Sequence, residues 1–118
     1  MQLLTADIHA RLLANGRQQE PVRGTDREID FHPVVKLFTP DADCTWLLTE
    51  IDPENPDIAF GLCDLGMGFP ELGSVSLAEI AALRGGLGLP VERDLHFKAA
   101  KRLSAYAAEA TRLDRIQA

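Results

Sequence analysis

The stretch CTWLLTEIDPENPDIAFGLCDL, residues 44–65, decides which fold the sequence predicts. Two apolar runs, 44–51 and 58–65, flank the polar segment DPENPD. Apolar runs of this length, separated by residues that favour turns, are typical of two neighbouring antiparallel strands. The nonapeptide TEIDPENPD at their junction, residues 49–57, holds four carboxylates and two prolines. It is either a solvated turn or a place where carboxylates do chemistry.

Further strand signals lie on both sides of this stretch. The β-branched and aromatic run VVKLF, residues 34–38, precedes it across the turn TPDAD. The run LGSVS, residues 72–76, follows it across the break GMGFPE. Strands at this close spacing, joined by tight turns, predict an antiparallel meander of about four strands.

An N-terminal helix is predicted over residues 5–15. Apolar side chains recur every four residues from Leu4 onward, which is the spacing of one helix face. Thr5 can cap the start of this helix, and Gly16 after Asn15 can close its end in a left-handed conformation.

Two more helices follow the strands. Ser76 precedes Glu79 by three residues, and this capping-box pattern predicts the start of a capped middle helix. Gly85 and Gly86 are expected to end it. A C-terminal helix is predicted over residues 104–115.

Together these elements predict an α+β fold with helices packed on one face of the sheet. The 118 residues are expected to form a single domain, residues 1–118, with enough apolar residues for a core. Trp46 is expected to anchor that core under a helix. The expected core residues are Leu4, Ile8, Leu12, Leu37, Trp46, Leu48, Phe60, Leu62, Ile80 and Leu83.

Localisation is predicted from what the chain lacks. The N-terminus meets charge at Asp7 and Arg11, so it has no apolar region of signal-peptide length. No apolar run approaches the roughly 20 residues that a membrane span needs. We therefore expect a cytoplasmic protein that does not contact a membrane. In that compartment Cys44 and Cys63 are expected as buried thiols, and they can form a disulfide only if their strands are neighbours.

Charge is distributed unevenly along the chain. Residues 1–36 hold five basic and five acidic side chains, and residues 84–118 hold seven basic and four acidic ones. Residues 37–83 hold nine acidic side chains and no lysine or arginine. Direct nucleic-acid binding on this acidic sheet is therefore not expected.

Three interpretations of the nonapeptide compete. A calcium loop of the EF-hand type needs glycine at its sixth position, but the sixth residue from Asp52 is Asp57, which excludes this motif. A catalytic pair of carboxylates needs a cleft that adjacent turn residues seldom form. A hairpin turn, stabilised by Pro53, Pro56 and local side-chain hydrogen bonds, fits the composition best. Binding of a partner is a fourth use that such a turn allows.

Other motifs with known chemistry have little support. Asp41 and Asp43 can bind a divalent ion but are typical turn formers after a proline. The histidines His9, His32 and His96 lack zinc-site spacing, and the glycine pairs lack the remainder of a phosphate loop. No catalytic residue, metal or cofactor is predicted.

The chain also resembles a known family. The block VVKLFTPDADCTWLLTEIDPENPDIAFGLCDLGMGFPELGSVSLAEI, together with GLPVERDLHF and LLTADIHARLLANG, resembles the bacterial family called domain of unknown function 2958. The resemblance covers nearly the whole chain. It implies a small accessory protein of plasmids and other mobile genetic elements, and it assigns no catalytic residues.

Two functions remain as hypotheses. In the first, a small acidic interaction protein of a mobile element binds a basic host-defence or conjugation protein, in the manner of a nucleic-acid mimic. The partner-binding residues are then Asp41, Asp43, Glu50, Asp52, Glu54 and Asp57. In the alternative, Asp41, Asp43, Glu50 and Asp52 hold a divalent metal that hydrolyses a phosphodiester.

Overall fold

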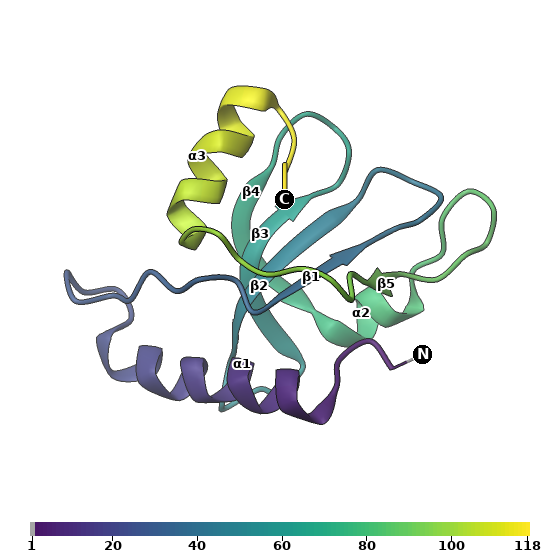
Figure 1. The fold of residues 1–118 in the computed structure, drawn as a ribbon. Helices are drawn as coiled ribbons and strands as arrows, with labels where there is room; N and C mark the ends of the chain where they lie inside the picture. The colour runs from purple at the N-terminus through teal and green to yellow at the C-terminus, as the bar shows by residue number, and fades with distance from the viewer. Residues whose placement is uncertain (1) are drawn as a thin grey trace.

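Four consecutive strands form the antiparallel meander that the sequence predicts (Figure 1). The computed structural model describes residues 2–118. It places β1 (Val35–Phe38), β2 (Thr45–Ile51), β3 (Ile58–Asp64) and β4 (Glu71–Ser76) side by side in chain order. A fifth strand, β5 (Glu92–Arg93), pairs with β1, so that β4 and β5 are the two edges of the sheet.

The fifth strand is absent from the sequence prediction. It has only two residues, which pair with Phe38 and Leu37 of β1. Two residues carry no detectable alternation, so only the tertiary structure assigns them to the sheet. The fold class is nevertheless α+β, as predicted, with three helices: α1 (Ala6–Gln19), α2 (Leu77–Ala82) and α3 (Leu103–Leu113).

Helix α1 begins where the sequence predicts and ends later. The Thr5 hydroxyl accepts a hydrogen bond from the Ile8 amide at 3.1 Å, which confirms the cap. The predicted end at Gly16 is wrong, because α1 continues to Gln19 and into a short 3₁₀ turn, Glu20–Val22. Gly16 is buried against β2, where any side chain would overlap the Ile51 carbonyl oxygen. Glycine at this position permits close packing of helix on strand.

Helix α2 has the predicted Ser76 cap, and Asp57 supplies a second acceptor at the same helix end. The Ser76 hydroxyl accepts a hydrogen bond from the Glu79 amide at 3.2 Å. The preceding amide in the first turn, that of Ala78, donates to the Asp57 carboxylate at 2.9 Å. Helix α2 ends at Ala82, before the predicted glycines, and Leu83 turns into an extended conformation.

We expect Ser76→Ala to lower the free energy of unfolding by about 1 kcal/mol, because the Glu79 amide loses its acceptor. Urea denaturation followed by circular dichroism measures the change. Ser74→Ala is the matched control, since Ser74 is an exposed serine of the same strand. An equal effect of both substitutions would contradict the capping role.

The core lies on both faces of the sheet, so the prediction of helices on one face is wrong. Trp46 and Leu48 of β2 join a cluster with Leu12 of α1 and Ile80 of α2. Leu47, between them in the strand, points to the other face. Figure 1 shows α1 and α3 on separate parts of the sheet. An uninterrupted apolar run such as WLL needs cover on both sides.

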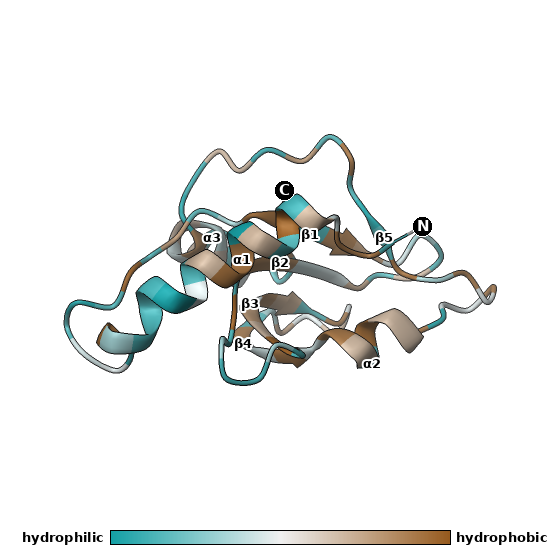
Figure 2. Ribbon diagram, turned by 90° about the horizontal axis from the view of Figure 1, so that it is seen from below, coloured by the Kyte–Doolittle hydropathy of each residue, from teal (hydrophilic) through white to brown (hydrophobic). Residues whose placement is uncertain are grey.

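Helix α3 provides the second cover. Its buried residues Leu103, Tyr106 and Ala110 form an apolar stripe that packs with Leu47 and Leu62. The strands are mostly apolar, whereas the C-terminal end of α1 and the loop after it are hydrophilic (Figure 2).

Most of the predicted core is confirmed. Six of its ten residues are buried: Leu12, Leu37, Trp46, Leu48, Leu62 and Ile80. Leu4, Ile8 and Phe60 are half-buried at the edge of a cluster. The prediction that Leu83 belongs to the core is wrong, because this residue follows the end of α2 and is 41% exposed.

Candidate partner-binding surface

The nine carboxylates of residues 37–83 are almost entirely without basic partners. Within residues 2–118, Glu50 alone among the nine lies in an ion pair. Five of the others are exposed, and they are Asp43, Glu54, Asp57, Glu71 and Glu79. The meander therefore presents negative charge that the fold itself does not neutralise.

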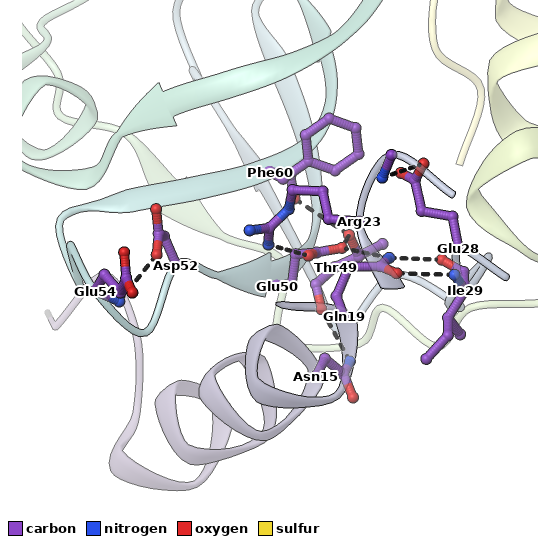
Figure 3. A network of polar contacts seen from close by, with 11 residues as sticks. Asn15, Gln19, Arg23, Glu28, Ile29, Thr49, Glu50, Asp52, Glu54 and Phe60 are labelled. Carbon is purple, nitrogen blue, oxygen red and sulfur yellow. Dashed lines mark hydrogen bonds and ion pairs between the residues drawn. The ribbon is translucent and has the colours of Figure 1, made fainter. Parts of the chain in front are cut away.

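Glu50 is the exception, and its buried side chain lies in a network of polar contacts (Figure 3). Its carboxylate contacts Arg23 and the Gln19 amide nitrogen, each at 3.3 Å, and the Thr49 hydroxyl at 3.5 Å. The Glu50 side chain is 5% exposed, and that of Arg23 is 46% exposed. A partner that approaches from solvent meets Arg23 first, so Glu50 has a place in the fold that the sequence does not reveal.

A β-bulge produces this position for Glu50. The register with β3 passes from Leu48↔Gly61 to Glu50↔Phe60, which leaves Thr49 without an opposite residue. The Asn15 side chain of α1 donates to the Thr49 carbonyl at 2.9 Å, and the Thr49 hydroxyl donates to the Phe60 carbonyl at 3.3 Å. These two bonds occupy backbone acceptors beside the bulge.

The rest of the nonapeptide forms the predicted turn between β2 and β3. The Asp52 carboxylate accepts from the Glu54 amide at 2.9 Å (Figure 3). Glu54 and Asn55 are exposed. The prediction of a solvated turn is wrong for residues 49–51, which belong to β2 and are buried. These residues are buried because apolar side chains pack on both faces of β2.

Asp57 links this turn to α2. Its carboxylate accepts from the Ser76 hydroxyl at 2.6 Å and from the Ala78 amide at 2.9 Å. These hydrogen bonds, that of Ser76 first, lower the pKa of Asp57 below its usual value. Asp57 is therefore ionised at neutral pH, exposed, and part of the structure that holds α2.

Asp41 and Asp43 lie at the other end of β2, in the turn between β1 and β2. The Asp41 carboxylate accepts from the amides of Leu87 and Leu89 at 2.7 and 3.2 Å. It packs so closely on Gly85 that a side chain there would overlap it. Asp41 thus anchors the loop after α2, whereas Asp43 is exposed.

The six predicted partner-binding residues therefore do not form one cluster. The seven residues of β2, about 23 Å of extended chain, separate Asp41 and Asp43 from the group at the β2–β3 turn. The same separation divides the four ligands of the metal hypothesis. Among residues 2–118, no group of three or more histidine, cysteine or acidic side chains is placed to hold a metal ion.

Both cysteines are free thiols. Cys63 lies in β3, and Cys44 directly precedes the adjacent strand β2. Burial raises the pKa of Cys63 to about 11, and burial is also the main cause that raises the pKa of Cys44. Thiols of this kind are poor nucleophiles at neutral pH.

The family model for the protein of unknown function DUF2958 matches residues 3–117. The chain belongs to the DUF2958 family. This confirms the resemblance seen in the sequence, and the DUF2958 match includes every carboxylate described above. Comparison with curated proteins and with solved structures gives no match. In the described part of this DUF2958 chain, residues 2–118, no helix has the length and apolar character to cross a bilayer.

Proposed function

We propose that the chain is a non-enzymatic interaction protein that docks its acidic meander on a basic surface of a partner. The observation that carries the proposal is the set of five exposed carboxylates in a block without lysine or arginine. Charge of one sign on a surface accelerates encounter with an oppositely charged partner and disfavours wrong partners.

The partner class follows from this charge and from the family context that the sequence suggests. A basic nucleic-acid channel of a host-defence or conjugation protein offers complementary charge. The hydrolase alternative receives less support, because Asp41 and Asp43 lie one strand length from Glu50 and Asp52. It also lacks a lysine in the acidic block.

The residues best suited to meet a partner are the exposed ones that do not hold the fold together. Glu54 and Asp43 satisfy this condition at the two ends of β2. Glu50 is buried, Asp41 anchors a loop, and Asp57 caps α2, so changes at these three would disturb structure as well as charge.

We expect the double substitution Asp43→Lys and Glu54→Lys to slow association with a basic partner about tenfold, with a smaller effect on dissociation. The partner is first captured from a host lysate and identified. Surface plasmon resonance then measures both rate constants at several salt concentrations, and added salt should also slow association.

Asp26→Lys is the matched control, since Asp26 is an exposed aspartate outside the acidic block. Thermal melts should be nearly equal for all three proteins. Association that is indifferent to salt and to the double substitution would refute the proposal. A melting temperature that rises with Mg²⁺ or Mn²⁺ would favour the hydrolase instead.

A further inference from the structure

Strand β4 is an open edge of the sheet. Its six residues pair with β3 in an unbroken register from Cys63↔Glu71 to Ile58↔Ser76. The opposite edge, β5, has only two residues. Proteins usually protect a long edge strand with lysine, proline, a bulge or a covering element. Strand β4 contains no lysine or proline, and its pairing has no bulge.

The backbone groups that β4 leaves free can be assigned from its ladder. Leu77 donates its amide to the Asp57 carbonyl at 2.8 Å, in line with the register of the strand. Because hydrogen-bonded and non-hydrogen-bonded pairs alternate in an antiparallel ladder, Val75, Gly73 and Glu71 also face β3. The amide and carbonyl groups of Leu72 and Ser74 therefore face outward.

The face of the sheet is hollowed next to this edge. Leu72 and Ser74 lie opposite Leu62 and Phe60, on the sheet face that carries α3. Leu72 is 49% exposed. Two hollows of about 290 and 210 Å³ share Phe60 as a lining residue, and one reaches Ser74 and the other Leu72.

Charge around the edge identifies the chemistry of an occupant. Glu71 lies in the strand, and Asp57 and Glu79 lie at its end. Asp43 lies against Gly66, in the loop that leads from β3 into β4. The first hollow also has Glu28, Glu50 and Asp52 in its lining, and the Arg23 that lines it is paired with Glu50. A segment with alternating basic and apolar side chains is complementary to this edge.

We infer that β4 captures an extended basic segment of a partner by β-strand addition. The segment pairs its backbone with Leu72 and Ser74, as other sheet edges do in peptide recognition. This mode of capture rests on the proposed function and specifies its partner. A second copy of the chain fits less well, since each copy has a net charge of −6 and paired β4 strands would bring Glu71 toward the Ser76–Asp57 end of the other.

The test uses the full chain and a synthetic eight-residue peptide of alternating lysine and valine. Hydrogen exchange read by nuclear magnetic resonance should show the Leu72 and Ser74 amides exchanging at least about tenfold more slowly with the peptide than without it. A glutamate–valine peptide of the same length should give no protection.

Two substitutions of Ser74 separate the contribution of its backbone amide from that of its side chain. Ser74→Pro removes an outward amide that β3 does not use and should abolish binding, because edge strands tolerate proline where the amide faces solvent. Ser74→Ala keeps the amide and should bind like the natural chain. Circular dichroism melts check that both variants are folded, and the exchange measurement on the natural chain does not depend on either.

Absence of protection at Leu72 and Ser74, or equal binding by Ser74→Pro, overturns strand addition. Peptide binding that survives Ser74→Pro but is lost with Asp43→Lys and Glu54→Lys overturns strand addition and supports electrostatic docking. Equal binding of both peptides overturns the basic occupant and with it the proposed function. Concentration-dependent protection without peptide overturns the inference in favour of a second copy.

Discussion

Trp46→Ala is expected to lower the free energy of unfolding by about 3–5 kcal/mol. The Trp46 ring is 2% exposed and lies in the cluster that joins the sheet to α1 and α2. Its neighbours in the ladder are Leu37 on one side and Cys63 on the other. Loss of so large a side chain leaves a cavity that a sheet with helices on both faces cannot readily close.

Chemical denaturation followed by far-ultraviolet circular dichroism measures this effect, because Trp46 is the only tryptophan and its fluorescence disappears with it. Leu95→Ala is the control, since Leu95 is a large apolar residue that is 66% exposed. Its change should stay within about 0.5 kcal/mol. A loss below about 1 kcal/mol for Trp46→Ala would refute its role as the core anchor.

Gly16→Ala is expected to destabilise the protein by about 2–3 kcal/mol, because the new methyl group would overlap the Ile51 carbonyl oxygen and push α1 from β2. The decisive observation is whether Gly16→Ala lowers or raises the free energy of unfolding. In a helix without such a contact, the same substitution stabilises by about 0.5–1 kcal/mol.

Gly73→Ala is the control for Gly16→Ala, since a methyl group on Gly73 would meet no atom within 4 Å. It should be neutral or slightly stabilising. Urea melts of both variants decide the question, and a more stable Gly16→Ala protein would show that the close packing of α1 on β2 is not required.

Asn15 and Gly16 illustrate where sequence patterns stop being informative. Asn15 followed by Gly16 has the composition of a helix end, and the structure uses both residues inside a helix. Asn15 donates to the Thr49 carbonyl and Gly16 admits Ile51, so the pair attaches α1 to the bulged part of β2. Both partners are more than 30 residues away in the chain, outside the reach of a local pattern.

The acidic residues show the same division. Their number and their isolation from basic residues are visible in the sequence, and they motivate the interaction hypothesis. Which of them face a partner is not visible. Glu50 and Asp57 are seven residues apart and flank the same turn. Glu50 is nevertheless buried beside Arg23, whereas Asp57 is exposed and accepts a hydrogen bond from the Ala78 amide of α2.

Patterns in the sequence are enough to predict the meander of β1 to β4, the starts of α1 and α2, and the uneven charge. The strands and the helix starts depend on side-chain alternation, turn residues or caps within a few positions of one another. The three-dimensional arrangement is needed to see that helices cover both faces, that β5 pairs with β1, and that β4 is an open edge. Those features depend on which distant surfaces meet, because burial and backbone pairing compare segments that are remote in the chain.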